Sequence, residues 1–392
     1  MMREVTGRTA LTMLLILPVC LYALEWTPGP KLPYSVLNAA AVTAQGRIYI
    51  LGGSSGGVDS SNIIDTIMSA PLNPDGSIGE FKIHSAKLPI PLAGQGAGVI
   101  DGQIYIYGGY NNNNYTVTGQ CWVIPIQPDG ELGAPVPASS GLPKEGAYQL
   151  ADGFGRCNMA FKNRLYIIGG EGQTRADNYP NLNMAYMNSP SGGNFGPSWT
   201  PMQQRNPVIS DAQQYPGVWN PSVAFYQGKA KDYAFQIGGC PHPNPGTFRS
   251  EGTTNKVAVA AINPATGMFD SWRLSNPLPV SKQCGIALCV KNQIYVIGGT
   301  ATGAAMDNKV YVGTIQEDTG DISWQIDAAL YPVQTRAPVG VTWEGSDGSI
   351  YIGVFGGHEG SALQSMYAKA YDPRTGAVTV SAPAEVAGAV AV

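Results

Sequence analysis

Short runs of aliphatic, β-branched and aromatic residues recur along the chain, and six of them end in a pair of glycines. Runs of this length and composition predict strands, and the glycines mark where each strand ends. The first glycines of successive pairs lie 56, 61, 69, 60 and 58 residues apart. Self-similarity at this period predicts a propeller or a solenoid. The pairs are Gly52-Gly53, Gly108-Gly109, Gly169-Gly170, Gly238-Gly239, Gly298-Gly299 and Gly356-Gly357.

A turn that closes on glycine follows every pair, as in Asn73-Pro74-Asp75-Gly76 and Gln127-Pro128-Asp129-Gly130. Proline fixes φ early in such a turn and glycine supplies positive φ at its end, so each turn predicts a hairpin. Small residues, such as Gly96-Ala97-Gly98-Val99, precede the strand that ends in the glycine pair and suit a crowded axis. Each repeat therefore holds four predicted strands, with the glycine pair after the second.

This arrangement resembles the kelch repeat, whose marks include a Gly-Gly at the end of the second strand and a tryptophan in the fourth. Trp199, Trp272 and Trp324 fit the tryptophan position, Phe81 stands in for it in the first repeat, and the second repeat departs from the pattern. The resemblance covers about residues 24 to 385. It implies an all-β fold, a six-bladed kelch-type β-propeller with four antiparallel strands per blade, in the superfamily of the galactose oxidase central domain.

Either end of the chain can complete the sixth blade. Residues 25–28 and 377–380 both read as a fourth strand, so there are seven candidate segments for six outer positions. We expect the local C-terminal hairpin to supply this strand, with the N-terminal segment added beside it or competing with it.

The first 23 residues read as a secretory signal peptide. Arg3 and Arg8 lie before an apolar run that ends at Ala23. This run is too short for a stable transmembrane helix. The prediction is a signal peptide over residues 1–23 and a single propeller domain over residues 24–392. The mature protein is then secreted and extracellular, or periplasmic if the host is a bacterium, and has no membrane span. An uncleaved anchor is the alternative.

Composition limits the partners. Charged residues make up 13% of the chain and the net charge is −4, without a basic run, which argues against a nucleic acid held through its phosphates. Without Cys20 five cysteines remain, an odd number that permits at most two disulfides. We favour a bridge between Cys240 and Cys284, which belong to neighbouring blades. Buried thiols that pack as small apolar groups are the alternative.

One face of the ring is expected to carry the function. In a kelch-like blade, the loop after the second strand and the loop that enters the first strand lie on the same face, and here these loops vary most in length. Variable loops on a rigid scaffold are the usual place for binding. The fourth blade has the most irregular ones, over about residues 202–220 and 240–255. They contribute Trp219 and Arg249 to the predicted ligand site.

Polar residues mark the start of the first strand in each blade, and Asn38 is the first of them. Polar groups around an axial mouth can bind an anion or a sugar, and arginines can hold a carboxylate through two hydrogen bonds. A water-filled channel with polar walls is the alternative reading. The predicted ligand-binding residues at the mouth are Gln95, Arg156, Asn220, Gln283 and Arg336, together with Tyr110 just after a glycine pair.

Acid–base candidates also follow the glycine pairs, namely Glu171, His358 and Glu359. A general base must reach a substrate proton, and the alternative is that these are simply solvated loop residues. The three histidines lie in three different blades, and no Cys/His spacing resembles a zinc motif. There is also no P-loop and no dinucleotide-binding glycine motif. We therefore expect neither a metal nor a cofactor.

These features favour a secreted binding or assembly module that recognises a glycan or an extracellular protein through its loop-rich face, and they lean against an enzyme. A variant is a subunit of an extracellular structure that self-associates through a free edge strand. The alternative is a sugar-active enzyme, because exported six-bladed kelch proteins include the sialic-acid mutarotases, which the chain resembles in size, blade count and export signal. That resemblance implies Arg156 or Arg336 as a carboxylate clamp and Glu171 or Glu359 as the base.

Overall fold

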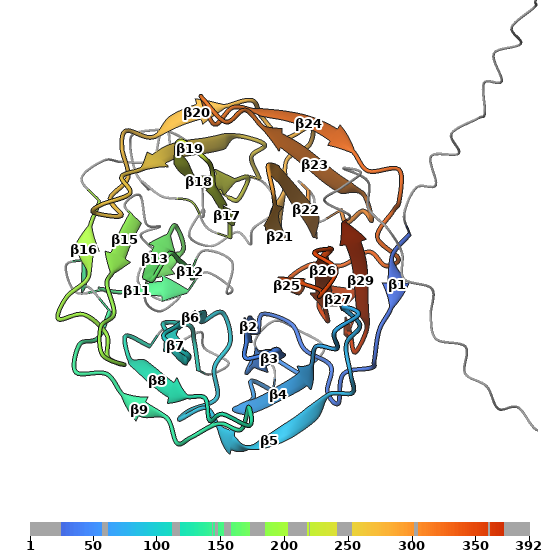
Figure 1. The fold of residues 1–392 in the computed structure, drawn as a ribbon. Helices are drawn as coiled ribbons and strands as arrows, with labels where there is room; N and C mark the ends of the chain where they lie inside the picture. Colours follow the sequence, from blue (N-terminus) through green and yellow to red (C-terminus); the bar gives the residue numbers. More distant parts are fainter. Residues whose placement is uncertain are drawn as a thin grey trace, which may run out of the picture.

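A computed structural model describes residues 25–56, 62–111, 118–142, 144–145, 148–152, 158–172, 185–202, 218, 220–240, 253–301, 305–359 and 361–371. Over these residues every regular element is a β-strand, and the strands form a ring around a central axis (Figure 1). The sheets contain six four-stranded units that follow one another around the ring. The predicted all-β propeller is confirmed. In the described part of the chain, no helix has the length and apolar character needed to cross a membrane.

The N-terminal half supplies the first three blades. Blade one consists of β2 (Ala40–Ala44), β3 (Arg47–Leu51), β4 (Thr66–Pro71) and β5 (Lys82–Lys87). Blade two consists of β6 (Gly96–Ile100), β7 (Gln103–Tyr107), β8 (Cys121–Pro125) and β9 (Val136–Pro137). Blade three consists of β12 (Asn158–Phe161), β13 (Arg164–Ile168), β15 (Ala185–Asn188) and β16 (Thr200–Pro201).

The remaining blades complete the ring. Blade four consists of β17 (Ser222–Gln227), β18 (Asp232–Ile237), β19 (Val257–Ile262) and β20 (Arg273–Ser275). Blade five consists of β21 (Gln283–Val290), β22 (Gln293–Thr300), β23 (Val310–Ile315) and β24 (Ile322–Ile326). Blade six consists of β25 (Val339–Glu344), β26 (Ile350–Phe355), β29 (Met366–Tyr371) and β1 (Thr27–Pro28). Five short strands lie outside the blades: β10 (Lys144–Glu145), β11 (Tyr148–Asp152), β14 (Glu171–Gly172), β27 (His358–Glu359) and β28 (Ser361–Ala362).

The N-terminal strand closes the ring. In β1 and β29, Thr27 lies opposite Ala368 and Pro28 opposite Tyr367. Our expectation that the C-terminal hairpin would supply this strand was wrong, because β1 occupies the outer edge of β29. The competing segment 377–380 lies outside the described residues.

Burial of Trp26 explains why the N-terminal segment takes this position. Its side chain is buried and meets the Tyr331 ring edge-on at 5.1 Å. The buried Lys369 on β29 pairs with Asp327, and its Nζ lies 6.0 Å from the centre of the Trp26 ring. A buried tryptophan stabilises a fold by about 3–5 kcal/mol relative to alanine. The sequence Ala-Val-Thr-Val at 377–380 has no aromatic side chain to offer in exchange.

Among the residues that the structure describes, five of the six glycine pairs connect their blade to the next one through a main-chain hydrogen bond. In five pairs the second glycine donates its N–H, at 2.7–3.0 Å, to a carbonyl that precedes the first strand of the following blade. The first glycine lets this carbonyl approach, since a Cβ on Gly298 would lie 2.7 Å from Thr335 O. Both glycines of every pair also have positive φ. The hydrogen bonds run from Gly53 to Leu92, Gly170 to Val218, Gly239 to Lys282, Gly299 to Thr335 and Gly357 to Val36.

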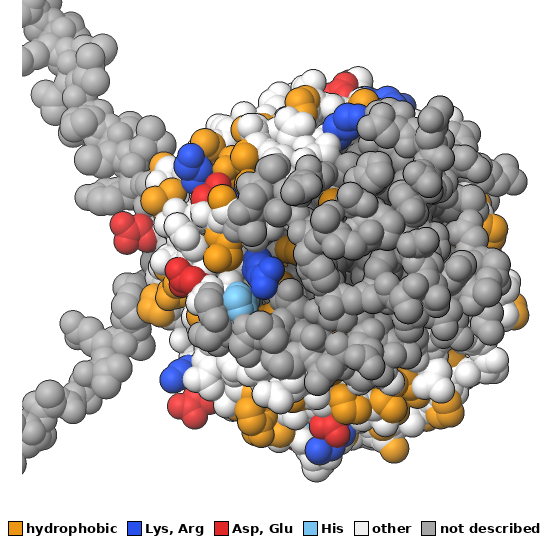
Figure 2. Space-filling model, turned by 180° about the vertical axis from the view of Figure 1, so that it is seen from behind, with side chains coloured by type: hydrophobic (Ala, Val, Ile, Leu, Met, Phe, Trp, Pro, Cys, Tyr) orange, Lys and Arg blue, Asp and Glu red, His pale blue; other side chains and the backbone are white. Residues whose placement is uncertain are grey.

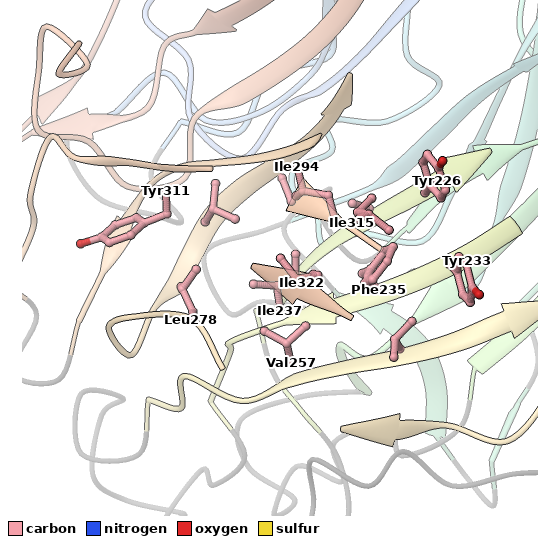
Figure 3. Close-up of a cluster of buried hydrophobic side chains, with 14 residues drawn as sticks. Tyr226, Tyr233, Phe235, Ile237, Val257, Leu278, Ile294, Tyr311, Ile315 and Ile322 are labelled. Atoms are coloured by element: carbon pink, nitrogen blue, oxygen red, sulfur yellow. The ribbon is translucent and has the colours of Figure 1, made fainter. Parts of the chain in front are cut away.

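The hydrophobic core is divided among the interfaces between blades. Six large clusters of buried side chains each combine residues of two neighbouring blades. Figure 3 shows the cluster between blades four and five, where Tyr233 and Phe235 of β18 meet Ile294 of β22 and Ile322 of β24. Because each core lies between blades, no blade can bury its apolar side chains alone.

Tyrosines of the second strands hold the hairpin turns of the following blades. Tyr49 Oη donates to Gly130 O at 2.9 Å, and Tyr166 Oη donates to Gly267 O at 3.0 Å. Both acceptors belong to the glycine-closed turns that the sequence predicts. These turns therefore serve the contacts between blades, on the face opposite the variable loops.

The structure records the four described cysteines, Cys121, Cys240, Cys284 and Cys289, as thiols. The expected bridge between Cys240 and Cys284 was therefore wrong. The two sulfurs have different surroundings, because Cys240 packs in a cluster with Tyr110, whereas Cys284 Sγ accepts a hydrogen bond from Asn220. Cys157 lies outside the described residues.

Candidate functional site

Main-chain hydrogen bonds join five blades around the axial mouth. Gly94 N donates to Asn38 O at 2.8 Å, Asn38 N to Ala337 O at 3.2 Å, Ala337 N to Cys284 O at 2.8 Å, and Cys284 N to Asn220 O at 3.2 Å. We call these five residues the mouth ring. All have positive φ, from 49° to 69°. Cysteine and alanine adopt this conformation here as well as glycine and asparagine, so the position rather than the residue type requires it.

The mouth ring shows how the predicted site residues of different blades align with one another. Asn38 and Asn220 belong to the ring, Gln283 and Arg336 come directly before ring residues, and Gln95 comes directly after one. Polar residues that look equivalent in the sequence therefore occupy three different positions. A difference of one residue reverses the side of a strand on which a side chain lies, so these residues do not line one common surface.

The residue before the mouth ring lies opposite the residue that follows the glycine pair of the same blade. Directly opposite residues of antiparallel strands place their side chains on the same side. In blades one and two these pairs are mainly apolar, and in blades five and six they are polar. The pairs are Leu37 with Ser54, Ala93 with Tyr110, Gln283 with Thr300, and Arg336 with His358.

Arg336 and His358 form a pair on the polar side of the mouth. Arg336 N donates to His358 O at 3.2 Å and His358 N donates to Arg336 O at 2.9 Å. Arg336 is half-buried, and His358 is 8% exposed. On the face seen in Figure 2, a histidine side chain lies beside a basic one near the middle. The structure thus brings together one predicted ligand-binding residue and one predicted catalytic residue.

The two carboxylates among the catalytic candidates lie elsewhere. Glu359 is exposed and follows His358 along β27, so its side chain points to the other side of the strand from that of His358. Glu171 lies in β14, opposite Asp152 of β11, in a small sheet outside the blades. Of the three candidates, His358 is therefore the one paired with an arginine.

Four predicted ligand-binding residues are buried in contacts within the protein. Tyr110 has no exposed surface, and its hydroxyl accepts a hydrogen bond from Asn38 Nδ2 at 3.1 Å. Gln95 Nε2 donates to Leu51 O at 2.7 Å and thereby joins blades two and one. Asn220 and Gln283 are 0% and 5% exposed. These side chains contribute first to the contacts between blades.

Three further predicted ligand-binding residues, Arg156, Trp219 and Arg249, lie outside the described residues. The same holds for most of the two long loops of blade four. Their assignment to the ligand site stays a prediction.

An ion pair between a buried lysine and a partly exposed aspartate, which the sequence interpretation missed, involves the residue two positions before Cys284 of the mouth ring. Lys282 is 3% exposed, and its Nζ lies 2.7 Å from Asp307 Oδ1, while Tyr311 Oη donates to Asp307 Oδ2 at 3.0 Å. Burial lowers the pKa of Lys282, and the hydrogen bond and charge of Asp307 oppose this shift. The available signal was a lysine at a position where other blades have Val36 or Leu92.

Metal binding finds no support in the part of the chain that the structure describes. No three His, Cys, Asp or Glu side chains among those residues are grouped closely enough to hold an ion. The chemistry available at the mouth is that of a guanidinium beside an imidazole, next to a cysteine thiol. This set suits an anionic, hydrogen-bonding ligand.

Comparisons with known proteins agree with this fold. A family model described as the kelch motif matches residues 91–124, within blade two. The solved structure of YjhT aligns with a TM-score of 0.63 at 15% identity, over 90% of this chain and 99% of that one. At this identity the likeness shows the fold alone. A search of curated proteins gives no match.

Six four-stranded units around one axis define the class of the protein as a β-propeller. The kelch motif matches within blade two, and a glycine pair recurs at the end of the second strand of all six blades. In these features the chain is similar to kelch-repeat propellers.

Proposed function

We propose that this protein is an exported recognition module that binds a glycan carrying a carboxylate at the axial mouth, on the side of blades five and six. The observation that supports this most is the pairing of Arg336 with His358. A guanidinium binds a carboxylate through two parallel hydrogen bonds, and an imidazole beside it can donate to or accept from a sugar hydroxyl.

The binding part of the proposal is tested on an array of glycans with and without carboxylates. Arg336→Ala is expected to lower the affinity for acidic glycans by roughly 10- to 100-fold, since a hydrogen bond to a charged group is worth about 1.5–3 kcal/mol. The matched control is Arg273→Ala, because Arg273 lies on the outer strand β20 and pairs at the surface with Asp321. Equal loss in both variants, or none in Arg336→Ala, would contradict the site. If the protein bound other proteins and no glycan, the proposed glycan ligand would be wrong and a protein ligand would take its place.

Export is the second part of the proposal and rests on the pattern of residues 1–23. N-terminal sequencing of the protein recovered from the medium or the periplasm is expected to begin at Leu24. Recovery only from the cytoplasm, with Met1 or Met2 still present, would contradict it.

The second candidate function is catalysis on a sugar acid, as the resemblance to the sialic-acid mutarotases implies. This candidate is favoured by His358, whose imidazole can transfer protons. His358 lies on the same side of the mouth as Arg336, the proposed carboxylate clamp. Magnetization exchange between the anomers of a sugar acid measures this activity by NMR. The wild-type protein should accelerate the exchange between the anomers, and His358→Ala should abolish this acceleration. If the wild-type protein does not accelerate the exchange, the catalytic candidate is excluded.

A further inference from the structure

Cys284 differs from the other described cysteines in its surroundings. Cys121 and Cys240 are buried, whereas Cys284 is partly exposed at the mouth ring. Burial raises the pKa of Cys121 well above its usual range and that of Cys289 to about 12, which keeps both thiols protonated and unreactive. Cys289 is partly exposed as well, but it lies near the other end of β21, where its Sγ donates to Lys291 O. Cys284 is therefore the partly exposed thiol at the mouth ring.

Asn220 presents two polar atoms to this thiol. Its Nδ2 donates to Cys284 Sγ at 3.2 Å, across 64 residues of sequence. A hydrogen bond donated to sulfur stabilises negative charge on it. Asn220 has no exposed surface, and its Oδ1, on the same amide, has no hydrogen-bond partner. Buried amide oxygens usually accept a hydrogen bond, and a hydroxyl on the neighbouring sulfur would lie within reach of this atom.

We propose that Cys284 is a site of reversible oxidation, where hydrogen peroxide converts the thiol to a sulfenic acid that the side chain of Asn220 holds. The sulfur attacks one oxygen of the peroxide, the S–O bond forms as the O–O bond breaks, and the departing hydroxide takes up the proton of the thiol as water. The sulfur loses two electrons and the peroxide gains them. The new S–OH group donates to Asn220 Oδ1, while Nδ2 still donates to the sulfur.

The location gives this oxidation a consequence for binding. Ala337 N donates to Cys284 O, and Arg336 directly precedes Ala337. The modified residue is thus bonded to the neighbour of Arg336 and adds polar bulk close to it. Oxidation of Cys284 is therefore expected to alter the approach of ligands to Arg336. The chemical step itself does not depend on the proposed function, and it is tested separately.

The test treats the purified protein with an equimolar amount of hydrogen peroxide in the presence of dimedone, which traps sulfenic acids. Peptide mapping by mass spectrometry is expected to find the adduct on the peptide that contains Cys284. Cys284→Ser should remove the adduct, and Cys289→Ser, a control on the same strand, should keep it. An adduct found instead on Cys121, Cys157, Cys240 or Cys289, or none at all, would overturn the proposal. The mapping of the wild-type protein decides this even if a variant fails to fold.

The role of Asn220 is tested by the rate of labelling. Asn220→Gly removes the amide and keeps a residue that accepts the positive φ of this position. We expect labelling of Cys284 to slow at least about ten-fold, the factor that corresponds to one hydrogen bond. A variant that loses stability but is labelled at the wild-type rate would show that Asn220 is merely structural.

Discussion

At the scale of single residues, a positive φ explains only part of why a position needs glycine. Gly298 and Gly46 have nearly the same φ, +68° and +66°. A Cβ on Gly298 would lie 2.7 Å from Thr335 O, in the next blade, whereas a Cβ on Gly46 would have nothing within 4 Å. The two positions therefore separate the cost of the conformation from the cost of crowding between blades.

The prediction is that Gly298→Ala lowers the free energy of unfolding by about 3 kcal/mol or more and Gly46→Ala by about 1 kcal/mol. The difference arises because only the first substitution pushes a carbonyl away from the N–H of Gly299. Urea unfolding of both variants measures it. Equal losses would mean that the glycine pairs are selected for φ alone.

His84 is a buried titratable group on the outer strand β5. Its Nε2 lies 2.6 Å from Ser69 Oγ and its Nδ1 lies 3.2 Å from Glu131 Oε2. Burial lowers the pKa of His84; the charge of Glu131 opposes this shift, and the charges of Lys82 and Arg47 add to it. The imidazole therefore stays neutral in the folded protein below the pH at which it protonates in the unfolded chain.

This shift predicts a loss of stability on mild acidification. Above the usual pKa of 6.5 the imidazole is neutral in both states and contributes no pH dependence. Below it the unfolded chain binds a proton that the folded protein does not, so the free energy of unfolding falls by up to about 1.4 kcal/mol per pH unit. Urea unfolding between pH 7.5 and 5.5 measures the slope.

His84→Gln should flatten this slope, because glutamine keeps a polar side chain and does not titrate. The range is chosen to avoid Glu131, whose pKa is lowered by its hydrogen bond with Lys82. The stability that this carboxylate contributes is lost only below its usual value of 4.5. An unchanged slope in the variant would assign the pH dependence to other groups.

At the scale of elements, the short strand β1 completes blade six with only two paired residues. Trp26, the residue directly before β1, contributes most to the attachment of this strand to blade six. Its ring packs on Tyr331 and lies beside Lys369. Trp26→Ala is therefore expected to destabilise the protein by about 3–5 kcal/mol. Thermal or urea unfolding measures this loss.

The matched comparison is truncation after Gly376, which removes the competing segment 377–380 and should change stability by less than about 1 kcal/mol. A larger loss on truncation than in Trp26→Ala would mean that the C-terminal segment closes the ring in solution. Limited proteolysis of each variant locates the end that has been released.

The second strands and the turns could be predicted because their signals are local. Alternating apolar residues, a glycine pair and a glycine-closed turn all lie within one repeat. The closing strand could not be predicted, because two segments had similar local patterns. What separates them is the burial of Trp26 against Tyr331, about 300 residues further along the chain. Which of two distant segments pairs with β29 cannot be predicted from the local sequence of either segment.

At the scale of the whole molecule, the six-fold recurrence was enough to predict the propeller, and the site was predicted only in part. Arg336 and His358 were each recognised as candidates, and their pairing follows from the antiparallel register. The contact of Asn220 with Cys284 was not foreseen, because it joins two blades and has no counterpart in the sequence of either. Gln95 was predicted to line the mouth, and the structure places its side chain in a buried hydrogen bond to Leu51 O.

The mouth ring joins neighbouring blades without using the side chains that give the mouth its chemistry. Its hydrogen bonds use main-chain atoms alone, so they persist whatever side chains stand on either side of them. A library randomised at Gln283, Thr300, Arg336 and His358 would therefore vary charge and hydrogen bonding beside main-chain hydrogen bonds that stay the same. Such a protein is a starting point for the laboratory evolution of new binding specificities on one unchanged frame.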